Sequence, residues 1–287
     1  DAAPEFPELK RQSDPLDGQR WFVNKSGMTM VVIPGPVEFT MGVPADEPGR
    51  RTLPRHRSKE VPFQRRLSRS FAIAAKELTF GEYERYRPGF LEYARQPESG
   101  TTYEPNRPHL SAAKTIDGVL FEDALLYCNW LSSREGIPSE QHCFEISANG
   151  GIRFKEDFLS LTGYRLATES EWEYACRGET VTARHYGLSE DLLPKYGWHQ
   201  ANSMSHAWSP GLLRPNDFGL YDMLGNRYEW THGYYVDLAE QPANGTSVEE
   251  IVSLVPLPSR KFPRYSIRGG SCRWRHHSAG ANHSLSE

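Results

Sequence analysis

The sequence predicts an α+β domain in which short strands and a few amphipathic helices are joined by long loops. Two strand patterns lie early in the chain, at Met28–Ile33 and Val37–Met41, with a Pro-Gly-Pro turn between them. Two later segments, around Cys128 and after Thr168, carry helical spacing and helix end signals. Beyond them Gly, Pro, Asn and Trp recur with little periodicity, so we expect the second half to be dominated by loops.

The composition is that of a globular protein. The 287 residues are 38% hydrophobic and 24% charged. A net charge of -4 and a pI near 6.2 argue against non-specific nucleic-acid binding. There is no apolar run of transmembrane length and no signal segment, so we expect no membrane span and favour the cytoplasm. Residues 1–25, rich in Pro, Asp and Arg, are expected to form an arm or linker, and residues 26–287 the domain.

The next segment of the chain, Arg50–Arg69, is dense in Lys and Arg. It is either an anion-binding patch or a solvated loop or edge strand that carries protective charge. We favour the second interpretation because the segment lacks interleaved aromatic residues and the whole chain is acidic. A strand at Phe71–Ala75 should follow, and then a helix capped by Thr79 with Glu82 three residues on.

The segment "FEDALLYCNWLSS" predicts an amphipathic helix. Its apolar residues recur three and four positions apart, at Phe121, Ala124, Leu125, Cys128 and Leu131. We therefore expect Cys128 to be a core thiol. The four cysteines contain no CxxC pair and are too few for a disulfide framework, so structural zinc of the finger type is not expected.

The segment "GYRLATESEWEYACRG" predicts a second helix with stronger end signals. Thr168 can accept from the amide three residues on, Glu171 can reach back, and Gly178 can end the helix. Trp172 in this block and Trp230 in a later one are expected to be largely buried, because each block is too apolar for a surface loop.

Five blocks in order now resemble one family: "MVVIPGPVEFTMG", "FEDALLYCNWLS", "GYRLATESEWEYACRG", "NDFGLYDMLGNRYEWT" and "SIRGGS". They are similar to the signature blocks of formylglycine-generating-enzyme (sulfatase-modifying factor) domains, and the similarity runs from Met28 to Ser271. The resemblance implies a single α+β domain with little regular secondary structure, related to the C-type lectin fold. It also implies a larger bacterial parent protein, such as a protein kinase.

The resemblance further implies a test of chemistry, because these enzymes oxidise a substrate cysteine with copper held by two thiols. Family members place the first thiol three residues after Gly-Gly-Ser and the second five residues later. Here those positions hold Trp274 and Ala279, and Cys272 stands two residues early without a partner. Copper(I) prefers soft thiolates, so we do not expect a copper cofactor. His276, His277 and His283 are either metal ligands or exposed polar side chains. We favour the latter, since neighbours on an extended chain point to opposite faces and no acidic ligand accompanies them.

Calcium is the cofactor that the resemblance does imply. The stretch "DMLGNRYEW" aligns with the family's calcium loop. By position, Asp222 and Glu229 would supply side-chain oxygens, and Gly225 and Arg227 main-chain carbonyls, which are the hard donors that calcium prefers. The alternative is that the two acids only cap local turns.

The terminal stretch "RGGSCRWRHHSAGANHSLSE" is therefore expected to be a recognition surface, since Arg and Trp are frequent at binding hot spots. It also resembles the hypervariable segment that variable proteins of diversity-generating retroelements display near this Gly-Gly-Ser. The candidate ligand-binding residues are Cys272, Arg273, Trp274, Arg275, His276, His277, Ser278, Gly280, Asn282 and His283.

Two functions thus stand at the level of sequence. The first is a non-catalytic binding or display domain that takes an unidentified protein or other ligand. The alternative is a copper-dependent oxidase that converts a cysteine of a sulfatase-type substrate to formylglycine. The missing thiol pair favours the binding domain.

Overall fold

Short strands and helices alternate along the residues described by the computed structural model, which are 20–42, 62–96, 110–182, 184–234, 248–249 and 265–272. The strands are β1 (Trp21–Val23), β2 (Thr29–Ile33), β3 (Val37–Met41), β4 (Phe63–Leu67), β5 (Phe71–Ala74), β6 (Phe144–Ile146), β7 (Ile152–Phe154), β8 (Glu229–Tyr234), β9 (Val248–Glu249) and β10 (Tyr265–Arg268). The α-helices are α1 (Phe80–Glu84), α2 (Phe90–Arg95), α3 (Phe121–Glu135), α4 (Glu169–Arg177) and α5 (Gln200–Ser203), and the 3-10 helices are η4 (Ser139–Gln141) and η5 (Glu190–Lys195).

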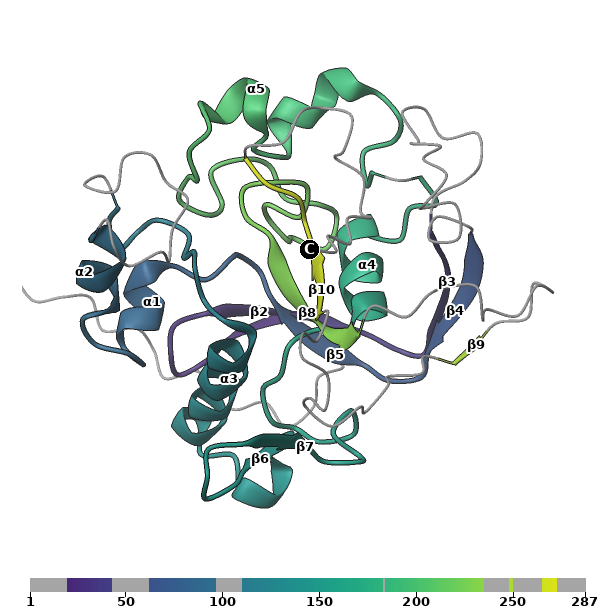
Figure 1. Ribbon diagram of the computed structural model, residues 1–287. Helices are drawn as coiled ribbons and strands as arrows, with labels where there is room; N and C mark the ends of the chain where they lie inside the picture. The colour runs from purple at the N-terminus through teal and green to yellow at the C-terminus, as the bar shows by residue number, and fades with distance from the viewer. Residues whose placement is uncertain are drawn as a thin grey trace, which may run out of the picture.

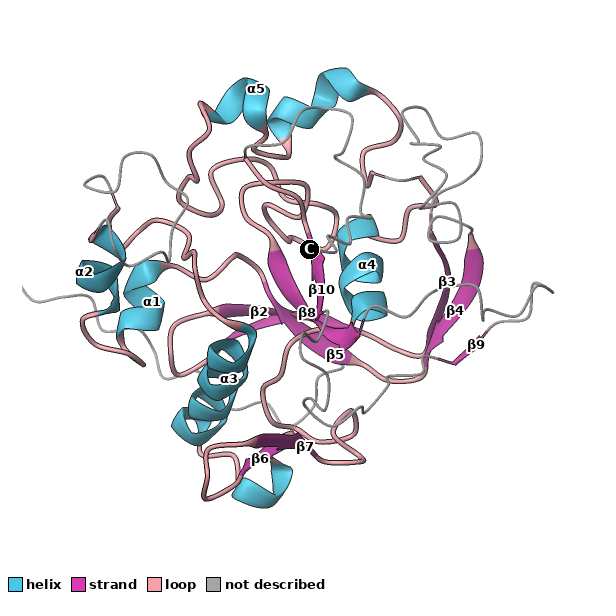
Figure 2. Cartoon of the chain, in the orientation of Figure 1, coloured by secondary structure: helices cyan, strands magenta, loops and turns pink. Residues whose placement is uncertain are grey.

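The described strands form four small sheets. Strands β1, β2 and β5 form an antiparallel sheet in that order, and β3 pairs antiparallel with β4, which pairs parallel with β9. The pairs β6–β7 and β8–β10 are antiparallel. Figure 1 shows α4 beside β8 and β10 near the centre, with α1, α2 and α3 on one side and β3 and β4 on the other. The predicted α+β class with little regular secondary structure is confirmed, and Figure 2 shows how much of the chain is loop.

The core around α4 holds the sheets together. Trp172, Ala175 and Cys176 pack in one buried cluster with Val31 and Ile33 of β2. Two further clusters surround α3, one toward α1 and α2 and the other toward β6 and β7. Burial of apolar side chains stabilises by about 25 cal/mol per Å², so the helices are positioned by these contacts more than by propensity.

The predicted helix starts are confirmed at both capping boxes. The Thr79 hydroxyl accepts from the Glu82 amide at 3.1 Å, while the Glu82 carboxylate accepts from the Thr79 amide at 2.8 Å. Thr168 and Glu171 repeat this arrangement at α4, where Gly178 ends the helix in the left-handed region. Each box satisfies backbone donors that a helix otherwise leaves open.

The two tryptophans predicted to be buried differ in outcome. Trp172 is 1% exposed, as predicted. Trp230 is only partly buried: its ring meets Phe121 edge-on at 5.7 Å, and its indole N–H donates to the carbonyl of Val119. Trp230 stays partly exposed because it packs at the margin of the α3 cluster, where the apolar character of its block does not guarantee enclosure.

Three further expectations concern the N-terminal arm, the basic segment and a membrane span. Strand β1 lies inside the range 1–25 that was expected to be an arm, because its three residues pair with β2. Of the basic segment Arg50–Arg69, the last residues form β4, where Arg66 pairs with Glu38 across the sheet at 3.7 Å. Over the described residues, no helix is long and apolar enough to cross a membrane.

Candidate functional site: the entry to the C-terminal segment

Strand β10 leads into the terminal stretch and lies near the centre of the fold. Ile267 and Arg268 pair with Trp230 and Glu229 of β8. Two glycines follow in the left-handed region, Gly269 with φ +92° and Gly270 with φ +91°. Side chains disfavour this conformation, which explains why the turn into the terminal segment carries two glycines. Cys272, two residues later, is the last residue of this segment that the structure describes.

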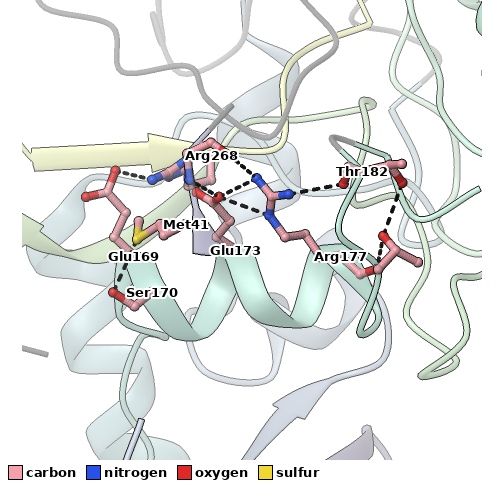
Figure 3. A network of polar contacts seen from close by, with 9 residues as sticks. Met41, Glu169, Ser170, Glu173, Arg177, Thr182 and Arg268 are labelled. Atoms are coloured by element: carbon pink, nitrogen blue, oxygen red, sulfur yellow. Dashed lines mark hydrogen bonds and ion pairs between the residues drawn. The ribbon is translucent and has the colours of Figure 1, made fainter. Parts of the chain in front are cut away.

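A buried charge network anchors β10 to α4 (Figure 3). The Glu173 carboxylate accepts from the Arg177 guanidinium at 2.7 Å, from Arg268 at 3.3 Å and from the backbone of Gly42 at 2.8 Å. Arg268 also pairs with Glu169 on the preceding turn of α4. Because Glu173 is fully buried and Arg177 nearly so, the position of β10 is fixed by charges that have few alternative partners.

Cys272 is completely buried at the end of this path. Its amide donates to the carbonyl of Asn226 at 2.9 Å, and its carbonyl accepts from the Ser203 hydroxyl at 2.6 Å. The other cysteines are Cys128, Cys143 and Cys176, and they too are buried thiols. Burial raises the pKa of Cys128 and Cys176 to about 12, so these thiols stay protonated and unreactive.

The loop from Asp222 to Glu229 lies directly against this entry. A Cβ added to Gly269 would meet the carbonyl oxygen of Arg227 at 3.2 Å and the Oε1 atom of Glu229 at 3.7 Å. The second oxygen of Glu229 accepts from the indole of Trp172 at 3.0 Å. The structure therefore brings Arg227 and Glu229 oxygens together beside the glycine turn.

Asp222 contributes a buried oxygen with unmet bonding capacity. The side chain is 1% exposed, and its Oδ2 accepts from the amide of Gly211 at 2.6 Å. Its Oδ1 has no hydrogen-bond donor among the described residues. A buried carboxylate oxygen of this kind is able to accept from a water molecule or to coordinate a cation. Burial raises the pKa of Asp222 to about 6 and that of Glu229 to about 7.

Glu77 is a third acid that contacts this loop, and sequence reasoning missed it. Its oxygens accept from the Arg227 amide at 2.9 Å and from the Asn226 side chain at 2.5 Å. Burial, and then the nearby charges of Asp222 and Glu229, hold the pKa of Glu77 well above its usual range. The signal was present: Glu77 continues the alternate positions of Ile73 and Ala75 in an extended segment, which places it on the inner side.

The donor set fits a calcium ion in kind. Among the described residues, no three His, Cys, Asp or Glu side chains converge on one point, so a cation here would need main-chain oxygens as well. The carbonyl of Arg227 and the carboxylates of Asp222 and Glu229 are oxygens of the type that calcium selects. Gly225 belongs to the same turn, and its backbone packs so closely on Trp198 that a Cβ would lie 2.1 Å from the Trp198 carbonyl oxygen.

Aromatic side chains belong to the loops whose residues hold Cys272. Trp198 and Trp208 stack with ring centroids 5.1 Å apart, and the Lys114 ammonium lies 4.6 Å from the Trp208 ring. The Tyr228 hydroxyl is buried and has no hydrogen-bond partner among the described residues. Burial is also the first cause that raises the pKa of Tyr228 above its usual range. The Trp208 indole N–H donates to the carbonyl of Ser203 at 3.1 Å, so this ring contacts the residue whose hydroxyl holds Cys272.

A separate cleft of about 2160 Å³ lies between the β1–β2–β5 sheet and α3. Its rim exposes Trp21, Phe22 and Leu120, and it reaches inward to Glu77 and Glu229. Cys272 does not line it. The cleft is also lined by Arg227 and by Ile267 of β10. Its charged groups Arg69 and Arg165 are already paired with Glu171.

Of the predicted ligand-binding residues, only Cys272 lies within the described part of the chain. The remaining candidates, Arg273 to His283, and the positions Trp274 and Ala279 lie outside the described residues. The four predicted calcium ligands are all described, and they belong to one loop.

Comparison with known proteins places this geometry in a family. The family model "Sulfatase-modifying factor enzyme 1-like domain" matches residues 22–283. The chain is 28% identical over 232 residues to the formylglycine-generating enzyme of Mus musculus, covering 72% of this chain and 58% of that protein. The chain thus spans little more than half the length of this relative.

Two further relatives match shorter parts. The serine/threonine-protein kinase pkn1 of Chlamydia caviae is 42% identical over 79 residues, or 27% of this chain and 12% of the kinase. The inactive C-alpha-formylglycine-generating enzyme 2 of Bos taurus is 36% identical over 90 residues, or 27% of this chain and 29% of that protein.

Solved structures show the same fold. The variable protein 1 of Treponema denticola superposes with a TM-score of 0.63 at 22% identity, covering 90% of this chain and 88% of that one. PvdO from Pseudomonas aeruginosa gives 0.62 at 22% identity, covering 91% and 89%. Together with the family match over nearly the whole length, these likenesses mean that the chain belongs to the sulfatase-modifying factor enzyme 1-like (formylglycine-generating-enzyme-type) domain family.

Proposed function

We propose that this chain is a binding domain which uses the formylglycine-generating-enzyme scaffold to present the segment after Cys272 as a recognition surface. The observation that carries the proposal is the state of Cys272. It is the only thiol of the terminal stretch, it is 0% exposed, and its backbone is held on both sides. Copper(I) selects soft thiolates, and the positions that bear the thiol pair in the family are Trp274 and Ala279 here.

Two comparisons support this direction. A relative named as inactive shares part of the sequence, and a variable protein shares the fold over most of the chain. The alternative, a copper-dependent oxidase, is supported by the match to the mouse enzyme. The short kinase match supports a parent protein with further domains, although it covers a small part of the kinase.

The oxidase assay separates these two functions. We expect the purified chain not to convert a cysteine peptide of sulfatase type to formylglycine when copper(I) and oxygen are supplied. We also expect a copper(I) chelator of moderate affinity to retain the metal. Mass spectrometry reads out the first result and chelator absorbance the second; conversion of the peptide would contradict the binding function.

A matched set of variants tests the recognition surface itself. Substitutions from Arg273 to His277, with Trp274 kept, should each change the free energy of unfolding by no more than about 0.5 kcal/mol, as surface changes usually do. Trp274 is kept because a framework aromatic would be packed. Unfolding of the whole chain in these variants would show that the segment is a structural element and not a display surface.

We further propose that the Asp222–Glu229 loop holds a structural calcium ion, with Asp222 and Glu229 giving carboxylate oxygens and Gly225 and Arg227 carbonyl oxygens. The unpartnered Oδ1 of Asp222 supports this, as do the raised pKa values of both acids. The ion would neutralise charges that burial otherwise disfavours. It would order a loop that contacts the entry to the terminal segment.

Removal of calcium should therefore lower the melting temperature. A ligand at 100 times its dissociation constant stabilises the folded state by about 2.7 kcal/mol. For a domain of this size that amounts to roughly 5 to 10 °C between calcium and chelator, measured by differential scanning fluorimetry. The variant with Asp222→Asn and Glu229→Gln should lose this difference, whereas Asp117→Asn, which alters only the acid paired with the Arg227 side chain, should keep it. Equal melting temperatures in calcium and chelator would contradict the site.

A further inference from the structure

We propose that Glu77, acting through Asn226, is the positioning residue that fixes where the C-terminal segment leaves the fold. The inference rests on the proposed function in one respect only: it treats the chain after Cys272 as the recognition surface. The sequence analysis singled out neither residue, although the alternation that leads up to Glu77 indicates that its side chain faces inward. The structure shows them as the centre of a polar cluster that joins five segments.

Asn226 is the hub of this cluster. It is 0% exposed and adopts the left-handed conformation with φ +64°, which asparagine tolerates better than most residues. Its side-chain NH2 donates to Glu77 Oε2 at 2.5 Å and lies 3.0 Å from the Thr115 hydroxyl and 3.1 Å from the Trp208 carbonyl oxygen. Its side-chain oxygen accepts from the Trp208 amide at 2.8 Å. Every polar atom of the side chain is therefore used, and its orientation is fixed.

The backbone of Asn226 connects this fixed side chain to the terminal segment through hydrogen bonds. Its carbonyl accepts from the Cys272 amide at 2.9 Å, and its amide donates to the Trp198 carbonyl at 2.9 Å. The Cys272 carbonyl in turn accepts from the Ser203 hydroxyl at 2.6 Å. Cys272, the first residue after Gly-Gly-Ser, is thus held at both its amide and its carbonyl. The partner of its amide is Asn226, the residue that Glu77 orients.

Glu77 is suited to this role because the two oxygens of its carboxylate accept hydrogen bonds from different residues. Its Oε1 accepts from the Arg227 amide at 2.9 Å while Oε2 meets Asn226 and the Thr115 hydroxyl, at 2.9 Å for the latter. Two places earlier, the Ala75 carbonyl accepts from the Tyr221 amide at 2.9 Å. The segment around Glu77 therefore accepts hydrogen bonds from the backbone just before the loop, at Tyr221, and near the end of the loop, at Arg227. Buried hydrogen bonds to a charged acceptor are stronger than neutral ones, and an unmatched donor left behind is costly.

The consequence is local. The side chains of α3 and the clusters around it make no hydrogen bond to Asn226 in the described part of the chain. Loss of the Glu77–Asn226 contact should then free the Cys272 end of the entry while the rest of the core stays closed. Local opening of this kind is measurable wherever a buried reactive group reports on it. Cys272 is such a group, and the three other buried thiols serve as internal controls.

The experiment is thiol labelling of the native full chain with a small maleimide, with the rate at each cysteine read by peptide mass spectrometry. Glu77→Gln leaves one acceptor oxygen but turns an NH2 group toward either the Asn226 or the Arg227 donor. Asn226→Gly keeps the left-handed backbone and removes the side chain. In both variants we expect Cys272 to be labelled at least about tenfold faster than in the unmodified chain. The rates at Cys128, Cys143 and Cys176 should stay within about twofold.

Two further variants sharpen the test. Glu82→Gln makes the same chemical change in the capping box at the other end of this segment, and it should leave Cys272 protected. The double variant Glu77→Gln with Asn226→Asp restores the pair between residues 77 and 226 in the opposite sense but leaves the Trp208 carbonyl without the donor that Asn226 supplies, so Cys272 labelling should fall below that of Glu77→Gln without reaching its original rate. The inference is overturned if Cys272 labelling is unchanged in the single variants. It is equally overturned if all four thiols become reactive together, because that would be general destabilisation.

The labelling assay and the oxidase assay together keep this inference apart from the proposed function. If Cys272 responds to Glu77→Gln but the unmodified chain oxidises a cysteine peptide, the positioning role stands and the binding function fails. If no oxidation occurs and Cys272 does not respond, the binding function stands and the positioning role fails. Labelling in the presence of a chelator tests the calcium loop as well. Faster labelling of Cys272 without calcium would show that the ion, like Glu77, keeps Cys272 buried.

Discussion

Replacement of Glu173 by alanine is expected to destabilise the fold by about 4 kcal/mol, because it leaves buried charges without their partner. The Glu173 carboxylate accepts from Nε and Nη2 of the Arg177 guanidinium, from Arg268 and from the Gly42 amide. The side chains of Arg177 and Arg268 are 2% and 5% exposed, so water cannot take the place of the lost carboxylate. The free energy of unfolding from a denaturant titration measures the effect.

The neighbouring acid supplies the control. Glu169 also pairs with Arg268, but it is about one third exposed. Glu169→Ala should therefore cost only about 1 kcal/mol, since solvent can replace much of that interaction. Equal losses in the two variants would contradict the central role of Glu173. In that case the attachment of β10 to α4 would depend on the apolar contacts of the core instead.

A second large effect is expected from pH, and it depends on His232. The imidazole is 6% exposed, packs against Phe154 at 4.3 Å and Phe158 at 4.7 Å, and has no hydrogen-bond partner at either nitrogen among the described residues. Burial first, and then the positive charge of Arg165, lowers the pKa of His232 to about 4, while Glu171 opposes this shift. The folded state thus keeps the ring neutral over a range in which the unfolded chain binds a proton.

The sign follows directly from the difference in bound protons. Above the unfolded pKa of about 6.5 neither state is protonated, and His232 adds no pH dependence. As the pH falls from about 6.5 to about 4, only the unfolded state gains the proton, so stability is lost by about 3 kcal/mol in total. Below the folded pKa both states are protonated, and the loss attributable to His232 stops growing.

His232→Leu tests this expectation. The variant removes the titrating group and two buried polar atoms, so the free energy of unfolding should fall less between pH 7 and pH 4.5 than in the unmodified chain. NMR titration of the imidazole carbons in the unmodified chain gives the midpoint independently. A midpoint near 6.5, or parallel pH curves for the two proteins, would show that the ring is accessible to protons in the folded state.

Much of the local structure was predictable because it depends on residues close together in the chain. Both capping boxes join residues three positions apart, so "LTFGE" and "ATESE" were sufficient to place the starts of α1 and α4. The strands β2 and β3 followed from apolar alternation around a turn, and α3 from the spacing of apolar residues around Cys128. Trp230 was predicted less well, because burial at the margin of a core depends on which neighbours arrive from elsewhere.

The sequence by itself determined the family, the α+β class, the absence of the thiol pair at Trp274 and Ala279, and the loop from Asp222 to Glu229 as one candidate site. Only the tertiary structure revealed that Glu77 meets Asn226 149 residues further on, and that Arg268 reaches Glu173 across 95 residues. The physical reason is that a hydrogen bond or ion pair needs its partner within about 3 Å, a condition that no local pattern encodes. Chain folding alone brings those groups together, and with them it sets the point at which the terminal segment leaves the domain.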